Sequence, residues 1–201
     1  KKNILAVIPA RKGSKSIKNK NIKNFAGQPL IAWTINQALK SKAGRVIVST
    51  NSLEIKKISE KYGAEVPFLR KKSLSNDHIS IEPVIRDVLI FLKKNNNYVP
   101  DAVILLMPTS PFRKIEDINK AISIFKKNDS TSVISVTKAE ANQNPYWMLK
   151  IKNKKVTLAT GENLSKIKGR RQDLPDIFIR NDFVYIFKPN NLFTGNKGLY
   201  G

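Results

Sequence analysis

Short apolar segments alternate with amphipathic segments along the first two thirds of the chain. Apolar or β-branched runs typical of buried strands occur at 4–8, 45–49, 65–68, 102–107 and 131–136. Between them, helical spacing of apolar residues predicts helices over 30–42, 52–62, 79–95 and 115–127. This alternation is the pattern of parallel βαβ units. We therefore expect an α/β fold with an open, doubly wound, mostly parallel sheet.

The pattern changes after residue 137. Residues 146–151 and 155–158 predict a hairpin, and strand character returns at 183–187. We therefore expect one domain, 1–201, with an excursion over about 138–175. Because no closing helix is apparent near the end, we also expect the native chain to continue beyond Gly201.

Composition narrows the chemistry. The absence of cysteine excludes disulfides, thiolate nucleophiles and cysteine-ligated zinc, and His78 is the single histidine. Any divalent metal is therefore expected to be a hard ion bound through oxygen. The apolar runs are too short to span a bilayer, and no targeting segment is apparent, so we expect a cytoplasmic protein without a membrane partner.

The formal net charge of +22 raises the question of a nucleic-acid partner. Only eight of the 37 basic residues are arginines, and lysines occur in every segment. Proteins that read bases favour arginine and concentrate charge on one face. We therefore expect solvated lysine-rich faces and no nucleic-acid partner, with part of the charge serving an anionic small molecule.

The loop at 9–16 follows the first predicted strand and is rich in backbone donors and cations. Ligands of open α/β sheets bind at the carboxyl ends of strands, and such a loop can wrap phosphates. It lacks the GxxxxGK[ST] and GxGxxG patterns, which argues against a P-loop ATPase and an NAD-binding fold. A phosphate site and a solvated basic turn both remain open at this point.

Short blocks in a fixed order extend over nearly the whole chain. They are IPARKGSK at 8–15, KNI at 20–22, GQPLI at 27–31, YGAEVPFLR at 62–70, PTSP at 108–111, PYW at 145–147 and RRQDLP at 170–175. In order and spacing they resemble the N-acylneuraminate cytidylyltransferase (CMP-sialic acid synthetase) family. The resemblance implies a Rossmann-like sheet with a small β-hairpin excursion used for dimerisation.

The implied reaction joins CTP and a nonulosonic (sialic-type) acid. The anomeric hydroxyl of the sugar acid attacks the α-phosphate, pyrophosphate leaves and a CMP-sugar forms. Alignment and charge stabilisation suffice for this step, in agreement with a chain that lacks cysteine. The resemblance also implies Mg²⁺, with aspartate ligands expected beyond Gly201, and a homodimer whose arm begins near Tyr146 and Trp147. A local core role for these two aromatic residues is the alternative.

The resemblance assigns nucleotide contacts residue by residue. Arg11 and Lys20 are the implied catalytic residues. The implied nucleotide-binding set is Ala10, Arg11, Gly13, Ser14, Lys20, Asn21, Arg70 and Asp77, with Arg70 at the cytosine. Asn21 could instead cap a turn, and Asp77 could be the N-cap of the helix over 79–95.

On the sugar side the resemblance assigns Met107, Arg171, Asn181 and Tyr185. An arginine can clamp a carboxylate with two parallel hydrogen bonds. Tyr185 could equally belong to the core. Met107 stands where relatives have glutamine, which favours a 9-deoxy sugar with more apolar surface, unless Met107 is simply the buried end of the strand over 102–107.

Other departures from the family pattern are Lys12, Ser16, Asn51 and Asp182, the last at a position where glycine is common. Two alternatives therefore stay open. One is a related sugar nucleotidyltransferase, using Kdo with CTP or legionaminate with GTP. The other is a non-catalytic polyanion or nucleic-acid binder.

Overall fold

The computed structural model describes residues 3–13, 17–194 and 198–200. The chain divides into two compact units, one formed by Lys1–Ser135 with Asp182–Gly201 and the other by Val136–Asn181. The excursion expected over 138–175 lies within the second unit. Each unit is described separately below.

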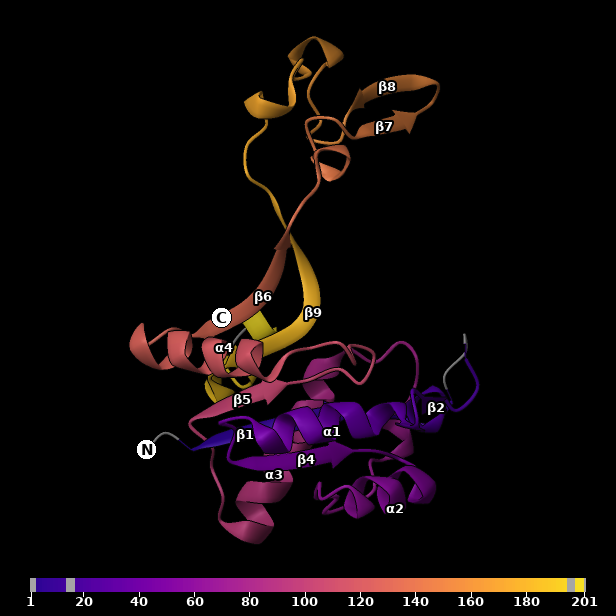
Figure 1. The fold of residues 1–201 in the computed structure, drawn as a ribbon, viewed down its shortest axis with the longest axis vertical. Helices are drawn as coiled ribbons and strands as arrows, with labels where there is room; N and C mark the ends of the chain where they lie inside the picture. Colours follow the sequence, from indigo (N-terminus) through magenta and orange to yellow (C-terminus); the bar gives the residue numbers. More distant parts are fainter. Residues whose placement is uncertain (1–2, 14–16, 195–197, 201) are drawn as a thin grey trace. The chain divides into compact units, whose positions relative to one another are not determined.

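The first unit is built on a five-stranded sheet in the order β4-β1-β5-β9-β6 (Figure 1). Its strands are β1 (Ile4–Pro9), β4 (Arg45–Ser49), β5 (Ala102–Leu105), β6 (Ser132–Lys138) and β9 (Phe178–Phe187). The residues of β6 after Ser135 and those of β9 before Asp182 belong to the second unit. Strand β1 pairs in parallel with both β4 and β5, whereas β9 runs antiparallel to β5. The expected α/β class is confirmed, with one antiparallel strand inside the sheet.

Four helices occupy the segments in which helical periodicity predicts them. They are α1 (Leu30–Lys40), α2 (Leu53–Lys61), α3 (Ile81–Asn96) and α4 (Ile115–Lys127). Local signals explain two of the starts. The Ser52 hydroxyl accepts from the Ile55 amide at 3.4 Å, and α4 has two acidic residues in its first turn, where the helix dipole favours them.

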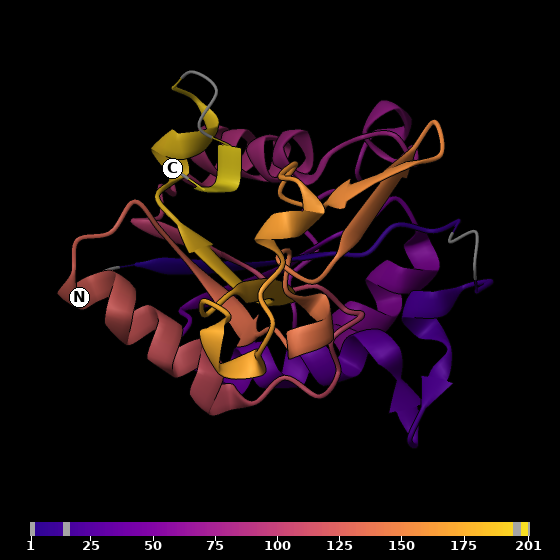
Figure 2. The same cartoon turned by 90° about the horizontal axis from the view of Figure 1, so that it is seen from above.

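Helices cover both faces of the sheet. Ile4, Ala6 and Ile8 pack into one core together with α1, α2 and α4, whereas Leu5 and Val7 pack into a second core with α3. Figure 2 shows α3 on one side of the strands and α1 and α4 on the other. Successive strand residues point to opposite faces, so a strand covered on both sides is apolar throughout, as residues 4–8 are.

Three predicted strands differ in the structure, and one of them, predicted over 183–187, begins earlier, at Phe178. Residues 65–68 form no strand and make only an isolated bridge between Ile47 and Glu65. Strand β5 ends at Leu105 rather than Met107. A short ladder that periodicity did not predict joins β2 (Asn24–Phe25) to β3 (Gln28–Pro29). An apolar run in the sequence indicates burial. A short run such as 65–68 can be buried without forming the continuous hydrogen bonds of a strand.

The second unit contains the expected hairpin, formed by β7 (Leu149–Lys152) and β8 (Lys155–Leu158). Asn153 and Lys154 turn the chain with φ angles of 51° and 61°. The Trp147 indole N–H donates to the Lys168 carbonyl at 2.6 Å, so Trp147 has a local partner within this unit.

None of the described helices, in either unit, is long and apolar enough to cross a membrane.

Candidate active site

Three polar segments of the first unit meet where β1 and β4 end. Because these strands are parallel, their carboxyl ends lie at the same edge of the sheet. The Ala10 amide donates to the Ser49 carbonyl at 2.9 Å, and the Lys12 amide donates to the Asn51 side chain at 2.8 Å. The basic loop after β1 is therefore bound to the residues that follow β4. Asn51, one of the departures from the family pattern, binds this loop through its amide oxygen.

Arg11 is held in place from two sides. One guanidinium nitrogen donates to the Gly13 carbonyl at 3.0 Å, and another forms an ion pair with the Asp77 carboxylate. The chain turns at Gly13 with a φ of 95°, a conformation that side chains with a β-carbon rarely adopt. Helix α3 begins at Ile81 with Ser80 at the N-cap position, so the alternative of Asp77 as the N-cap is wrong.

Asn21 binds the backbone of Arg11. It is buried, and its amide nitrogen donates to the Arg11 carbonyl at 3.0 Å. Lys20 precedes it in a short 3₁₀ helix over Lys20–Ile22 and is half-buried. Asn19, rather than Asn21, occupies the N-cap position of that turn. Asn21 therefore fixes the backbone of the basic loop, a structural role compatible with the implied nucleotide site.

Arg70 is a second cation at this edge and, unlike Arg11, it is buried. Its Nε donates to the Ser49 hydroxyl at 3.1 Å, and its Nη2 donates to the Ser49 carbonyl. Burial, assisted by the positive charge of Arg11, lowers the pKa of Arg70 to about 10. Arg70 is nevertheless charged at neutral pH. Two guanidinium groups therefore converge on one edge of the sheet, and each is oriented by protein oxygens.

Residues of the implied sugar side lie at the end of β5. Tyr185 pairs with Leu105 across the sheet and is 5% exposed, and its hydroxyl donates to the Asp182 carboxylate. Met107 is half-buried and packs against the second core. Tyr185 therefore has the burial of a core residue, with its polar end directed at Asp182.

Asp182 explains one departure from the family pattern. Its φ angle is 56°, in the left-handed region that glycine adopts without strain. Asp and Asn tolerate this region better than most residues do. This backbone conformation fits the glycine that the resemblance implies at this position, and Asp182 adopts it here.

Arg171 and Asn181 belong to the second unit. The Asn181 amide donates to the Thr137 hydroxyl at 3.0 Å. Arg171 is exposed and lines a small cavity of about 140 Å³ together with Asn144 and Asp176. Ser14, the remaining residue of the implied nucleotide site, lies outside the described residues.

The family resemblance implies Mg²⁺, so the described side chains were searched for groups that could bind a metal ion. Within residues 3–13, 17–194 and 198–200, no group of three or more histidine, aspartate or glutamate side chains could hold a metal ion. Mg²⁺ is commonly bound through one or two carboxylates together with substrate phosphates, and Asp77 places one carboxylate at this edge of the sheet.

Three residues of this edge were not predicted from the sequence. Ser49 anchors Arg70, and Arg113 and Gln37 bind the loop after β5. Arg113 lies two residues after the PTSP block at 108–111, and this proximity could have pointed to it in the sequence. Gln37 lies in a helix with no distinguishing pattern, so no sequence signal could have identified it.

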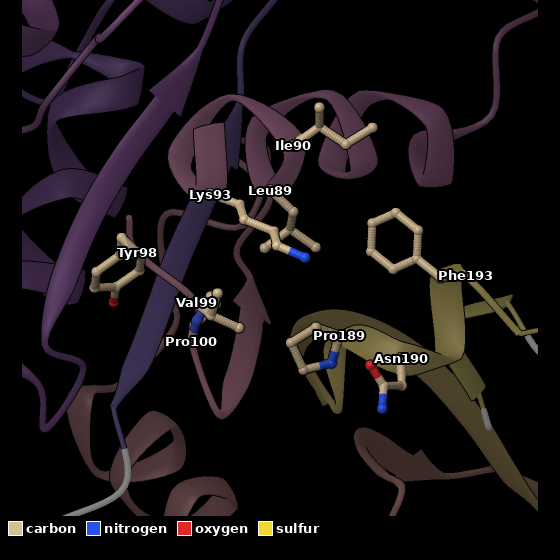
Figure 3. A pocket seen from close by; sticks show the side chains of 9 residues that line it. All are labelled: Leu89, Ile90, Lys93, Tyr98, Val99, Pro100, Pro189, Asn190 and Phe193. Carbon is tan, nitrogen blue, oxygen red and sulfur yellow. The ribbon is translucent and has the colours of Figure 1, made fainter. Parts of the chain in front are cut away.

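An apolar pocket lies elsewhere in the first unit. Its volume is about 320 Å³, and it is lined by α3, residues 98–100 and residues 189–193 (Figure 3). Pro100 precedes the start of β5, so this pocket lies at the amino end of that strand. It is therefore distinct from the edge that carries Arg11 and Arg70.

Comparisons with known proteins agree with this geometry. The family described as Cytidylyltransferase matches residues 5–200. A CMP-N,N'-diacetyllegionaminic acid synthase from Campylobacter jejuni is 37% identical over 205 residues, which cover 98% of this chain and 85% of that protein. An N-acylneuraminate cytidylyltransferase from Streptococcus agalactiae is 31% identical over 186 residues, covering 90% of this chain and 42% of that protein.

A solved structure has a similar fold at low sequence identity. The CMP:2-keto-3-deoxy-manno-octonic acid synthetase, complexed with CTP, superposes with a TM-score of 0.70. The match covers 95% of this chain and 76% of that one at 16% identity. At this identity the likeness concerns the fold alone.

Proposed function

Because this chain belongs to the cytidylyltransferase family, we propose that it joins CTP to a nonulosonic acid and releases pyrophosphate. The observation that carries the proposal is the convergence of Arg11 and Arg70 at the carboxyl edge of the sheet. Both guanidinium groups are oriented before any ligand binds. A preorganised cation such as Arg11 suits a polyphosphate, because it needs no rearrangement when the charge arrives, and Arg70 is fixed beside it for a contact with the base.

The proposed reaction forms one bond and breaks another at the α-phosphorus of CTP. The anomeric oxygen of the sugar acid bonds to phosphorus, the bond to the bridging oxygen of the β-phosphate breaks, and the hydroxyl proton passes to solvent. Arg11 and Lys20 would stabilise negative charge on the phosphates, and Arg70 would contact the cytosine. Alignment of the two substrates supplies the rest of the rate enhancement.

A pyrophosphate-release screen tests this proposal. The four nucleoside triphosphates are combined with a panel of nonulosonic acids and Kdo, with Mg²⁺ present. We expect turnover with CTP and a nonulosonic acid. Turnover only with GTP or only with Kdo would support the related-transferase alternative. Salt-sensitive binding to random duplexes without turnover would instead support a polyanion binder.

The requirement for Mg²⁺ stays a prediction of the family resemblance. Magnesium often takes most of its ligands from substrate phosphates and water. Omitting Mg²⁺ from the same screen therefore tests the requirement without any assumption about protein ligands.

We propose a diacetylated 9-deoxy nonulosonic acid as the preferred sugar. The half-buried thioether of Met107 supports this choice, as does the similarity to a legionaminic acid synthase. Met107→Gln should lower the preference for the 9-deoxy sugar over N-acetylneuraminate by about 2- to 10-fold, because the amide offers a hydrogen bond to a hydroxyl and replaces an apolar surface. The measurement is kcat/KM for both sugars in both proteins.

Two results would count against the role of Met107 in specificity. One is a wild-type preference for N-acetylneuraminate. The other is an unchanged ratio in Met107→Gln. In the second case Met107 is only a packing residue beyond the end of β5.

We also propose that the protein is a homodimer formed through the hairpin of the second unit. The cross-strand pairs Leu149 with Leu158 and Ile151 with Val156 place apolar side chains on one face. Ile151 is 73% exposed on that face. An isolated two-stranded hairpin is marginally stable, so an apolar face of this kind favours cover by a second copy.

Ile151→Lys should convert the dimer into a monomer, because a lysine in an apolar interface would have to lose its hydration. Thr157→Lys is the matched control, since it places the same charge on the opposite face of the hairpin. Sedimentation velocity measures the mass of each variant. A monomeric wild type, or a dimeric Ile151→Lys protein, would contradict this interface.

A further inference from the structure

Arg113 is a buried arginine whose three partners are neutral oxygens. It is 3% exposed, and its guanidinium donates to the carbonyl of Phe183, to the Gln37 side chain at 3.0 Å and to the Met107 carbonyl at 2.9 Å. Burial lowers the pKa of Arg113 to about 10. A buried cation without a counter-charge is costly, so its presence needs a reason other than packing.

The partners of Arg113 come from three different segments. Met107 lies in the loop after β5, Gln37 in α1 and Phe183 in β9. The guanidinium is planar and presents five N–H donors in a fixed fork, so one arginine can bind all three segments at once. A lysine ammonium lacks this fork.

Further hydrogen bonds tie the same loop to the same neighbours. The Gln37 amide donates to the Pro111 carbonyl at 2.7 Å, and the Ser110 hydroxyl donates to the Asp182 carbonyl at 3.3 Å. The loop over 107–113 is therefore attached to α1 on one side and to the Asp182–Phe183 backbone on the other. The Asp182 carboxylate also accepts a hydrogen bond from the Tyr185 hydroxyl.

We propose that Arg113 is a positioning residue that fixes the loop over 107–113 against β9 and thereby sets the sugar-acid side of the active site. This inference rests on the proposed function. Arg113 acts through the carbonyl groups of Met107 and of Phe183, which follows Asp182, whereas Arg11 and Arg70 lie on the nucleotide side. The two sides should therefore respond differently when Arg113 is changed.

Arg113→Lys tests the proposal with steady-state kinetics. Positional errors near 1 Å can cost about 100-fold in rate, so we expect kcat/KM for the sugar acid to fall by about 10- to 100-fold. The KM for CTP should stay within about twofold of the wild-type value, because the Arg11 and Arg70 contacts are unchanged.

Arg45→Lys is the matched control. Arg45 binds both oxygens of the Glu65 carboxylate, at 2.7 and 2.6 Å, but lies at the start of β4, away from the carboxyl edge. Its replacement should leave the kinetic constants of both substrates within about twofold of wild type. Gln37→Met is the second test variant, because it removes one arm of the network and retains Arg113. We expect a sugar-selective loss of about 3- to 10-fold.

The results separate the positioning role from the proposed function. A wild-type protein that turns over no nonulosonic acid overturns both. An active wild type whose Arg113→Lys variant resembles Arg45→Lys overturns the positioning role alone, as does an equal loss for CTP and sugar. If Arg113→Lys shows no cooperative thermal unfolding, Gln37→Met decides by the same criteria.

Discussion

Arg11→Ala should lower kcat by about 100-fold or more, with smaller changes in the KM for either substrate. The guanidinium is positioned by the Gly13 carbonyl and the Asp77 carboxylate, so its positive charge is in place before further negative charge develops on the phosphates in the transition state. Removing a preorganised charge of this kind affects the transition state more than the ground state. Lys20→Ala should have an effect of the same order, because Lys20 is proposed to stabilise the same phosphates and directly precedes Asn21, which binds the Arg11 carbonyl. Pyrophosphate release at saturating CTP and sugar acid measures both variants.

Lys18→Ala is the control for loss of a positive charge in the same loop. Lys18 is exposed, and its replacement should leave kcat within about twofold of wild type. Asp77→Asn should have an effect between those of Arg11→Ala and Lys18→Ala, since it retains Arg11 but weakens its orientation. A near-normal rate in Arg11→Ala or Lys20→Ala would remove that residue from the mechanism.

Arg70→Ala should weaken CTP binding by about 10- to 100-fold while changing the affinity for pyrophosphate by less than about threefold. The reason is that Arg70 is proposed to contact the base, which pyrophosphate lacks. Two of its nitrogens donate to Ser49, so the side chain is fixed in one orientation. Isothermal titration of the two ligands gives both constants.

Ser49→Ala separates the contact of Arg70 from its anchoring. This variant removes one hydroxyl acceptor and leaves the Ser49 carbonyl in place, so CTP binding should weaken only by about 2- to 5-fold. Thermal unfolding of both variants checks that the buried edge remains folded. Equal losses for CTP and pyrophosphate in Arg70→Ala would assign Arg70 to the phosphates and contradict its role at the cytosine.

The basic loop was predicted from sequence together with its place in the fold. A strand that ends at Pro9 and a loop rich in cations and backbone donors placed this loop at the carboxyl edge of the sheet, where a phosphate site and a solvated basic turn both stayed open. The structure brings Arg11 and Asp77 together although 66 positions separate them. Their contact depends on how α3 packs against the sheet, which local periodicity does not encode.

The residues around β9 show the opposite case. Periodicity predicted a strand over 183–187 but not its direction or its neighbour, and the structure places it antiparallel to β5. That pairing buries Tyr185 and brings the Phe183 carbonyl to Arg113. From the sequence, Tyr185 could be either a core residue or a sugar contact. The choice depends on its burial, and the burial of a strand residue depends on which strand lies beside it.

The alternation of strands and helices, the burial of β1 on both faces and the family of the chain could all be predicted from the amino-acid sequence. These properties follow from local spacing and from residue types, which act over a few positions at a time. The folded arrangement was needed to show which cations converge, that Ser49 orients Arg70 and that Arg113 joins three segments. Such contacts link residues far apart in the chain, and they form only once packing has fixed the distances between the elements.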